Sequence, residues 1–293
     1  MRINLALEWF LNPDHIPFIV GIKNGYYEDV GIELNIVTPN EHYDGFKALK
    51  NGEIEMAINE PLHLIEQFDN DMLSLGNFFE TDGGVLLSKP GAQKLLSGKK
   101  IKISSPVSNE ITNNIAMEIL RRYAVKHDVA INPLDISIDE VDFYHIKNIK
   151  EGYDGAWLAF ENFEGVEARL CNMPHILINA KNGGFPNFSA LSIFTTKNFY
   201  DKNKKVVENF LTATRKAIAK IKSDKTAAKN AYYDFAKEEP TKLMDEIIAD
   251  TLGRFDELFD SDAKTQEEIL EFFRLIRTTE LDYETFKTAF LKG

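Results

Sequence analysis

The sequence predicts an α/β protein with two lobes, mainly parallel sheets and a helical C-terminal region. Short apolar or β-branched segments alternate with helical segments twice, first over residues 1–85 and then over 86–189. An apolar segment at 190–197 follows, and residues 200–293 carry apolar residues at spacings of three and four, which indicates amphipathic helices. We therefore expect residues 1–85 plus 190–293 to form lobe I and residues 86–189 to form lobe II.

The first series of elements lies in lobe I. The predicted strands are "INLALEW", "IELNIVT" and "IEMAIN". The predicted helices are "HIPFIVGIKNGYY", "HYDGFKALKNG" and "PLHLIEQF". Gly25 and Gly52 come at the ends of the first two helices, where a left-handed C-cap favours glycine. Each strand is thus joined to the next by a helix, as in βαβ units.

The second series lies in lobe II and ends in a return to lobe I. The predicted strands are "KKIKIS", "ISIDEVDF", "YDGAWLAF" and "HILINA", and "ALSIFTTK" is the returning strand. The predicted helices are "SPVSNEITNNIAMEILRRYAVKH", "YHIKNIKEG" and "NFEGVEARL". We expect Ser105 or Ser108 to cap the long helix, because a serine hydroxyl accepts from free N–H groups of the first turn.

Composition and charge exclude several classes of function. The 293 residues carry a net charge of −12, which repels nucleic-acid phosphates and anionic membrane surfaces. The single cysteine excludes an internal disulfide and a cysteine-based metal site. No apolar run reaches the roughly 18 residues of a membrane span, and "MRINLALEWF" does not resemble a signal peptide. We expect cytoplasmic localisation as written, or a periplasmic or other extracytoplasmic location if a leader was removed.

The residues after the first predicted strand are candidates for ligand binding. Ligands of open α/β sheets lie beyond the carboxyl ends of the strands and at domain interfaces, so we expect a ligand cleft between the lobes. Trp9 offers a flat surface for a heterocycle, and Glu8 could accept from a ring amine. Asn12 and His15 follow on the same loop. From the residues alone, a Trp that fills the lobe beside a solvent-facing Glu explains the pattern equally well.

Two further segments of lobe I supply candidates. Asn40 lies in "TPNEHYDGF", where a strand-to-helix turn with an N-capping Asn is the alternative. Asn59 and His63 lie in "NEPLHL", and a capping or core role for the histidine is the alternative there. No Ser or Cys nucleophile is near His63 in the sequence, and the six dispersed histidines show no metal-binding spacing.

Lobe II contributes three candidate segments. Ser105 and Ser108 in "SSPVSNE" precede a helix whose N–H groups favour an anion, although glycine-rich and lysine phosphate signals are missing and capping explains them too. Asn162 and Glu164 lie among aromatic residues in "GAWLAFENFEG", where an amide and a carboxylate could read an aminopyrimidine edge. Phe188 lies in "GGFPNFS", which is a hinge, a cleft loop or a simple turn.

These segments together resemble a known family. "LALEWFLNPDHIPFIVGIKNGYYEDVGIELNIVTPNE", "LKNGEIEMAINEPLHLI", "ENFEGVEA" and "FPNFSALSIFTTKN" are similar to the NMT1/THI5-like (SsuA/THI5) family over most of residues 1–220. The resemblance implies a type II periplasmic-binding-protein clamshell. It also implies one of two activities. Some members bind formyl-aminopyrimidine thiamin precursors for ABC transporters, and others synthesise the thiamin pyrimidine from pyridoxal phosphate and their own histidine, with iron.

Three departures disfavour the synthase branch. The synthases carry "KxxxH" where this chain has "NEPLH", so Asn59 replaces the Schiff-base lysine while His63 is kept. The "CCCFC" motif of the synthases corresponds to "FPNFS", and their phosphate-binding glycine loop corresponds to "SSPVSNE". We therefore expect no cofactor and no metal. Pyridoxal phosphate, iron and a catalytic His63 belong to the synthase alternative alone.

We thus expect a non-enzymatic solute-binding protein for a small flat heterocycle, namely a hydroxymethyl- or formyl-aminopyrimidine precursor in thiamin salvage or biosynthesis. Trp9 would stack on the ring, and Glu8 and Glu164 would accept from its amines. The polar edge would be completed by Asn12, Asn162 and His63. The resemblance implies an ABC-transporter permease as a further partner. A sulfonate- or nitrate-type anion binder that uses the helix start at 104–109 is the second alternative.

Overall fold

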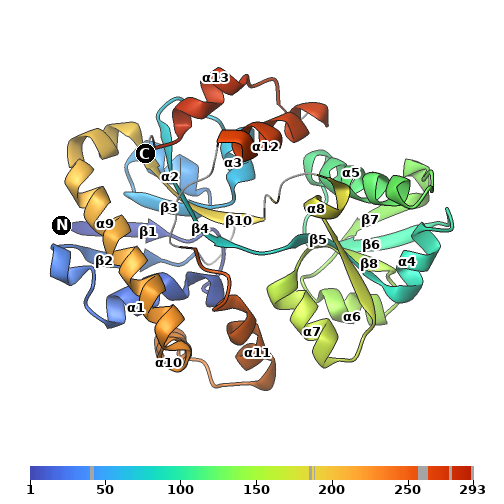
Figure 1. The fold of residues 1–293 in the computed structure, drawn as a ribbon, viewed down its shortest axis with the longest axis horizontal. Coiled ribbons are helices and arrows are strands. Elements are labelled where there is room, and N and C mark those ends of the chain that lie inside the picture. The colour runs from blue at the N-terminus through green and yellow to red at the C-terminus, as the bar shows by residue number, and fades with distance from the viewer. Residues whose placement is uncertain (40–42, 185–186, 188, 257–262, 277–278, 292–293) are drawn as a thin grey trace. The chain divides into compact units, whose positions relative to one another are not determined.

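The computed structural model describes residues 1–39, 43–184, 187, 189–256, 263–276 and 279–291. These residues form two compact units, coloured along the chain in Figure 1. Unit 1 comprises Met1–Glu80, Ala190–Gln266 and Leu281–Gly293, and unit 2 comprises Thr81–Ser189 and Glu267–Glu280. No described helix combines the length and the apolar character needed to cross a membrane.

Unit 1 is built on a five-stranded sheet with the order β2-β1-β3-β10-β4. The strands are β1 (Arg2–Ala6), β2 (Glu33–Val37), β3 (Met56–Asn59), β4 (Met72–Glu80) and β10 (Ala190–Thr196). β1 runs parallel to both β2 and β3, whereas β10 runs antiparallel to β3 and β4. The carboxyl ends of β1, β2 and β3 therefore share one edge of the sheet, where the loops after these strands begin.

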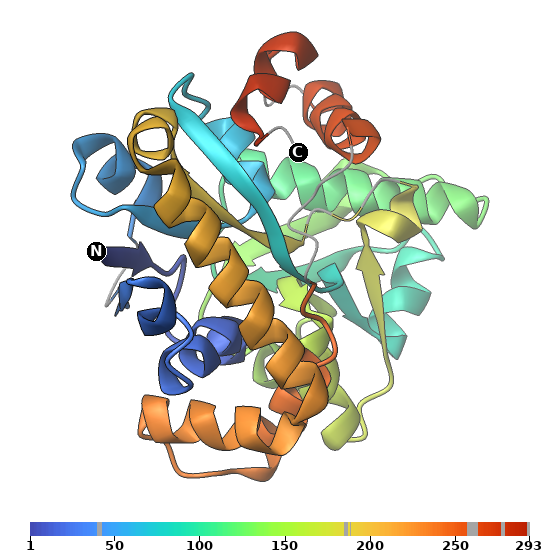
Figure 2. The same ribbon diagram turned by 60° about the vertical axis from the view of Figure 1, so that its left-hand side comes forward.

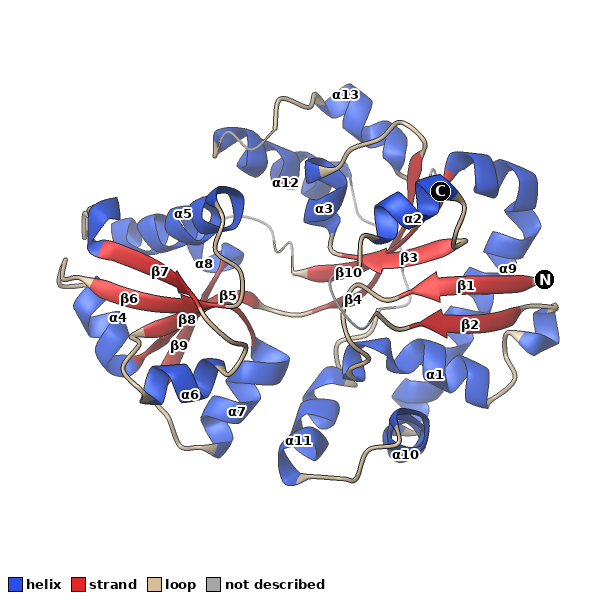
Figure 3. Cartoon of the chain, turned by 180° about the vertical axis from the view of Figure 1, so that it is seen from behind, coloured by secondary structure: helices blue, strands red, loops and turns tan. Residues whose placement is uncertain are grey.

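Helices cover both faces of this sheet. They are α1 (Ile16–Lys23), α2 (Gly45–Asn51), α3 (Pro61–Glu66), α9 (Lys197–Ser223), α10 (Lys225–Ala236), α11 (Lys242–Thr251) and α13 (Tyr283–Phe286). Figure 3 shows α2 and α3 on one face and α1 on the other, and the long α9 of Figure 2 packs against α1 and α10. The expected glycine C-cap is present after α2, where Gly52 has a φ of +70°.

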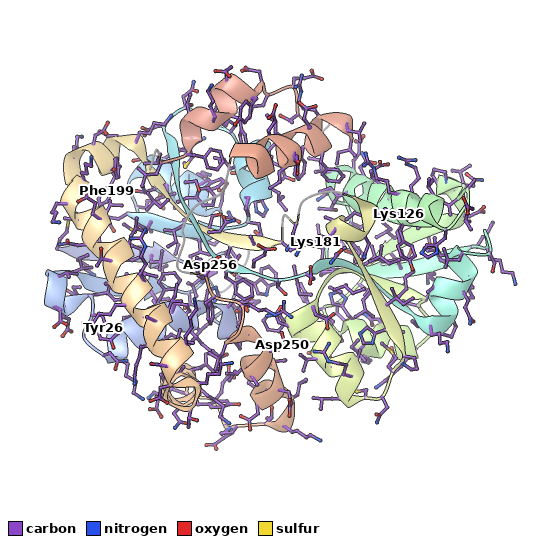
Figure 4. All side chains as sticks on the ribbon, viewed as in Figure 1. Tyr26, Lys126, Lys181, Phe199, Asp250 and Asp256 are labelled. Atoms are coloured by element: carbon purple, nitrogen blue, oxygen red, sulfur yellow. The ribbon has the colours of Figure 1, made fainter. Side chains whose placement is uncertain are left out.

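An aromatic core holds the α1–α9 face of unit 1 together. Phe18 and Phe210 are fully buried, and their rings stack with centroids 6.3 Å apart. The buried hydroxyl of Tyr27 is satisfied by Thr214 Oγ1 at 2.8 Å, so the phenol adds apolar area without an orphan polar group. Burial of each such ring stabilises the unit by about 1.5–3 kcal/mol. At the margin of this core lie the partly buried Tyr26 and Phe199, labelled in Figure 4.

Unit 2 is built on a second five-stranded sheet with the order β7-β6-β8-β5-β9. The strands are β5 (Gly83–Ser88), β6 (Ile101–Ser105), β7 (Ile136–Glu140), β8 (Gly155–Phe160) and β9 (His175–Asn179). β6 runs parallel to β7 and β8, and β5 runs antiparallel to β8 and β9. The carboxyl ends of β6, β7 and β8 again share one edge.

The described helices of unit 2 are all shorter than α9, and α5 is the longest of them. They are α4 (Lys89–Leu95), α5 (Glu110–Lys126), α6 (His145–Lys150), α7 (Val166–Leu170) and α8 (Ala180–Gly183). A π-helical turn, η4 (Glu161–Gly165), joins β8 to α7. The helix α12 (Ala263–Leu275) is divided between the two units, because a segment of unit 1 ends at Gln266 and the next residue belongs to unit 2.

The predicted α/β class with two sheets and a helical C-terminal region is confirmed, but three details differ. Both sheets are mixed, because β10 and β5 are antiparallel to their neighbours. β5 pairs within the second sheet, and residues 81–85 and Glu267–Glu280, expected in lobe I, belong to unit 2. The long helix begins at Glu110 and is capped by Asn109, whose Oδ1 accepts from Thr112 N, instead of by Ser105 or Ser108. β4, β5, α4 and α8 were not predicted.

Candidate functional site

A buried carboxylate–imidazole pair follows β1 in unit 1. The side chain of His15 is fully buried and that of Glu8 is 9% exposed. Nε2 of His15 lies 3.0 Å from each carboxylate oxygen of Glu8. The backbone N–H of Asn12 donates to Nδ1 at 3.2 Å, so the neutral ring carries its proton on Nε2, toward Glu8. Burial opposes a charge on the ring, but the Glu8 carboxylate outweighs it and raises the pKa of His15.

Asn12 organises the loop that carries this pair. It caps the 3-10 helix η1 (Pro13–His15), because its Oδ1 accepts from Asp14 N at 2.9 Å. Its Nδ2 donates to the Phe10 carbonyl at 3.1 Å. Between the pair and the cap, Trp9 remains 38% exposed, and its ring meets that of Phe10 edge-on at 5.2 Å. The loop therefore presents an exposed indole one residue after a fixed, largely buried carboxylate.

A second carboxylate–imidazole pair lies at the start of α3. Nδ1 of His63 is 2.9 Å from Oε2 of Glu60, and the two side chains are 31% and 28% exposed. Burial alone would raise the pKa of Glu60, but the adjacent imidazole lowers it. Burial lowers the pKa of His63, whereas Glu60, then Glu66 and Asp44, raise it above its usual value. The net result favours an imidazolium beside an ionised Glu60.

The end of β8 forms the corresponding region of unit 2. Asn162, in the π-helical turn η4, is fully buried, and its Oδ1 accepts from Thr81 Oγ1 at 2.8 Å. The backbone packs closely here, since a Cβ on Gly83 would lie 2.3 Å from Ser189 Oγ and 2.8 Å from the ring of Phe160. This close approach fixes the position of the turn against β5.

Glu164 is the second candidate on the same turn. The half-buried carboxyl accepts from the backbone N–H of Phe160 at 2.8 Å through Oε2. Burial raises its pKa to about 7, against the opposing effect of the Phe160 hydrogen bond. Within the described residues no basic side chain pairs with Glu164, whereas its neighbour Glu161 forms an ion pair with Arg169. Near neutral pH this carboxyl can therefore donate or accept a hydrogen bond.

The two predicted serines before α5 are used by the protein itself. The hydroxyl of Ser105 donates to the Val107 carbonyl at 2.5 Å, and that of Ser108 donates to the Ile138 carbonyl at 3.2 Å. The backbone N–H of Ser108 donates to the carboxylate of Glu140 at 3.3 Å. A protein carboxylate thus already lies at this helix start, which opposes the binding of a second anion.

The structure brings the candidates together in small sets within each unit. Four lie on the loop after β1, and Asn59 and His63 lie together after β3, where Asn59 Oδ1 accepts from Glu60 N at 3.1 Å. Asn162 and Glu164 share one turn of unit 2. Asn40 and Phe188 fall outside the described residues.

Three polar residues of these regions were missed by the sequence analysis. Glu60 pairs with His63, and Thr81 holds Asn162. Asp82 accepts from Asn179 Nδ2 at 2.8 Å and lies 3.5 Å from Nζ of Lys181, which Figure 4 labels. The segment "TDGG", two polar residues before paired glycines, is the signal that could have identified Thr81 and Asp82. Among the described residues, no group of three or more His, Cys, Asp or Glu side chains could hold a metal ion.

Comparisons with known proteins agree on a family and a fold. A family model described as NMT1/THI5 like matches residues 12–228. A Haemophilus influenzae protein named for thiamine biosynthesis is 22% identical over 280 residues, covering 93% of this chain and 86% of the relative. The 4-amino-5-hydroxymethyl-2-methylpyrimidine phosphate synthase of Aspergillus parasiticus is 20% identical over 265 residues, covering 87% and 76%.

A solved structure supplies the fold. The alkanesulfonate-binding protein SsuA from Xanthomonas axonopodis pv. citri, bound to MOPS, is similar with a TM-score of 0.68 and 12% identity, covering 100% of this chain and 98% of that chain. At this identity the likeness establishes the type II periplasmic-binding-protein fold alone.

Proposed function

Because the chain belongs to the NMT1/THI5 like family, we propose that it is a solute-binding protein for a small, flat amino-heterocycle of the thiamin-pyrimidine class. The proposed ligands are 4-amino-5-hydroxymethyl-2-methylpyrimidine and formyl-aminopyrimidine precursors. In this proposal the protein binds the heterocycle without a cofactor, in thiamin salvage or biosynthesis, and an ABC-transporter permease is its macromolecular partner.

The exposed indole of Trp9 beside the fixed carboxylate of Glu8 is the observation that carries the proposal. A large apolar ring that stays 38% exposed at the carboxyl end of a strand is available for stacking on a flat ring. His15 holds both oxygens of Glu8 at 3.0 Å from Nε2, so the carboxylate is fixed before a ligand arrives. A ring amine that reaches the 9% of this side chain that stays exposed would meet an acceptor whose orientation costs no further entropy.

Glu164 supports the same ligand class from unit 2. An aminopyrimidine edge presents a ring nitrogen that accepts and an adjacent amine that donates. A carboxyl whose pKa is raised to about 7 can be protonated near neutral pH, and it then donates to the nitrogen and accepts from the amine. The ionised form of the same carboxyl would repel an anionic ligand.

Fluorescence and calorimetry test the proposal together. The chain has two tryptophans, Trp9 in unit 1 and Trp157 in unit 2, so Trp157→Phe leaves Trp9 as the only indole. Addition of 4-amino-5-hydroxymethyl-2-methylpyrimidine should quench this indole. Trp9→Ala should weaken the affinity measured by calorimetry by about 1–3 kcal/mol, the usual range of base–aromatic stacking.

Phe235→Ala provides the matched control, because this aromatic is also exposed, at 39%, and lies on α10 of unit 1. Its affinity should equal that of the unmodified protein. Unchanged affinity in Trp9→Ala would reject the stacking role. Binding of MOPS or nitrate in place of the pyrimidine would favour the anion-binding alternative.

A synthase is the second candidate, because relatives such as the Aspergillus parasiticus protein are named as synthases and His63 is present. The resemblance implies pyridoxal phosphate for such an enzyme. Asn59 stands at the end of β3, where its amide cannot form a Schiff base, and the Glu140 carboxylate at the start of α5 would repel a phosphate. These residues do not fit that cofactor.

Absorbance and mass spectrometry separate the two candidates. We expect no Schiff-base band when pyridoxal phosphate is added, and no change in the mass of the peptide that contains His63 after incubation with iron and oxygen. Both changes appearing together would establish the synthase and overturn the binding-protein proposal.

A further inference from the structure

Three polar side chains lie in register across the sheet of unit 1. Ser192 of β10 pairs with Asn59 of β3 on one side and with Asn77 of β4 on the other. Residues directly opposite each other on neighbouring strands share a face of the sheet, with Cβ atoms about 4.5–5.5 Å apart. We call Asn59, Ser192 and Asn77 the amide row. It lies level with the carboxyl end of β3, because Asn59 is the last residue of that strand.

The amide row lies on the face of the sheet that carries α2 and α3 (Figure 3). Ile193 pairs with Ile58, and both are buried in the core of the opposite, α1–α9 face. Phe194, two residues after Ser192, meets the ring of Phe46 from α2 edge-on, with centroids 4.9 Å apart. Because side chains alternate along a strand, the row shares the α2–α3 face with Phe194.

Both amides of the row use their oxygen within the protein. Oδ1 of Asn59 accepts from Glu60 N at 3.1 Å, and Oδ1 of Asn77 accepts from the hydroxyl of Ser192, a residue only 1% exposed. Among the described residues neither Nδ2 has a hydrogen-bond partner, and neither is a buried atom, so both reach the surface. Two amide N–H₂ groups are therefore oriented for donation before a ligand arrives.

The charges beside the row oppose an anionic ligand. Glu60 follows Asn59 directly, and its carboxylate lies 2.9 Å from the imidazole of His63. Glu66 adds a second carboxylate on the same short helix. No lysine or arginine of the described part of the chain bonds to a side chain of the row. The donors of the row therefore suit an uncharged acceptor better than a phosphate or a sulfonate.

We propose that the amide row is a further binding subsite of unit 1 and takes a neutral carbonyl oxygen, as in a formyl or carboxamide group. Such an oxygen accepts from an amide N–H₂ and brings no charge toward Glu60. An alkylammonium group can only donate, so it would leave both Nδ2 donors unused. This inference rests on the proposed function, because it selects the formyl-aminopyrimidine from the proposed ligands.

Calorimetry with the formyl-aminopyrimidine and with its deformylated amine tests the subsite. The unmodified protein should bind the formyl compound about tenfold more tightly or better. Asn77→Asp keeps the oxygen that accepts from Ser192 and replaces the donor with an acceptor. It should weaken binding of the formyl compound by about tenfold or more, and leave the affinity for the amine unchanged or higher.

Two further variants complete this experiment. Asn59→Asp makes the same exchange on β3 and should also weaken binding of the formyl compound, so it serves if the β4 variant does not fold. Asn51→Asp is the matched control, because it adds the same charge to unit 1 at an exposed residue that ends α2. It should alter neither affinity.

NMR of the side-chain amides tests the row without a pyrimidine. Titration with N-methylformamide, a small neutral carbonyl compound, should move the Nδ2 resonances of Asn59 and Asn77, assigned by their loss in the two aspartate variants. Asn35 provides the internal control, since its Nδ2 already donates to Asn4 Oδ1 at 2.9 Å, and its resonances should stay in place.

The outcomes separate the subsite from the proposed function. Equal affinity for the formyl compound and the amine, or formyl affinity unchanged in both aspartate variants of the row, would overturn the subsite and leave the pyrimidine-binding proposal standing. Resonances of the row that move no more than those of Asn35 would also overturn it. If no pyrimidine binds the unmodified protein while N-methylformamide moves the row alone, the proposed function fails and the carbonyl subsite stands.

Discussion

Two carboxylates that follow strand ends are held in opposite ways. Glu8, after β1 in unit 1, is paired with the buried imidazole of His15 and is almost fully enclosed. Glu164, after β8 in unit 2, accepts from a backbone N–H and has no basic partner among the described residues. Burial therefore raises the pKa of Glu164 to about 7.

The difference shows that the partner of a carboxyl, more than its place in the fold, decides its chemistry. Both groups lie at the carboxyl edge of a parallel pair of strands. Removal of the partner of Glu8 and removal of the charge of Glu164 should therefore change the free energy of unfolding differently. Measurements at different pH values should distinguish the two changes.

His15→Ala should give the largest effect. It leaves the Glu8 carboxylate buried without its partner, which costs about 3 kcal/mol in the free energy of unfolding at pH 8. As the pH falls from 8 to 5, uptake of a proton by the stranded carboxyl reduces this loss, but the variant also lacks the stabilisation that the raised pKa of His15 supplies below the unfolded histidine pKa, so the two effects oppose each other. Urea unfolding at pH 5 and pH 8 measures this, with Trp9 as the reporter of unit 1 in a Trp157→Phe background.

The double variant Glu8→Gln with His15→Gln is the control for this experiment. It removes both charges and keeps an amide hydrogen bond, so most of the lost stability should return. A double variant no more stable than His15→Ala would show that the imidazole contributes packing alone.

Glu164→Gln should give a smaller effect that depends on pH through one group alone. The folded-state pKa is raised from 4.5 to about 7, so the contribution of the protonated carboxyl is present below the unfolded pKa and is lost as pH rises through about 7. Between pH 4.5 and pH 8, the free energy of unfolding of the variant should change by about 2 kcal/mol less than that of the unmodified protein, once the partial exposure of the side chain is allowed for. Trp157 reports on unit 2 in a Trp9→Phe background.

Glu161→Gln is the matched control, since this carboxylate lies on the same turn and pairs with Arg169. It should leave the pH dependence of unit 2 stability in place. If Glu164→Gln and the unmodified protein respond alike to pH, the carboxyl of Glu164 is ionised in the fold and the contrast with Glu8 disappears.

The sequence predicted most of the strands because their apolar patterns are local. "KKIKIS" covers all of β6 except its last residue, "HILINA" contains β9, and the glycine after α2 was placed correctly. The mixed character of the sheets was not predictable in this way, because the direction of β5 and β10 depends on pairing between distant segments. Asn109 was missed as the cap of α5 because serine and asparagine compete equally for that role.

The candidate residues were predictable by position, whereas their partners were not. The rule that ligands lie beyond strand ends selected Glu8, Trp9 and Glu164 from the sequence. The bond between Glu8 and His15 is made across one loop, and that between Thr81 and Asn162 joins residues 81 positions apart. Asn12 was expected to bind a ligand, and in the structure it caps η1, a role that the sequence pattern could not separate from binding.

Glu60→Gln tests an intermediate case between Glu8 and Glu164, and it should give the smallest of the three effects. Glu60 has a histidine partner like Glu8, but the pair is about one-third exposed. Burial lowers the pKa of His63 and the carboxylates, first Glu60, raise it, so the variant should lower the titration midpoint of His63 toward its ordinary value. The pair should contribute at most about 1 kcal/mol to the free energy of unfolding. This contribution is present below the unfolded histidine pKa and is lost as pH rises through the raised folded pKa.

NMR titration of the imidazole, assigned with His63→Asn, measures the shift in the titration midpoint. Glu66→Gln serves as the control and should move the midpoint less, because Glu66 is the weaker influence; a larger shift in that variant would make Glu66 the principal partner of His63.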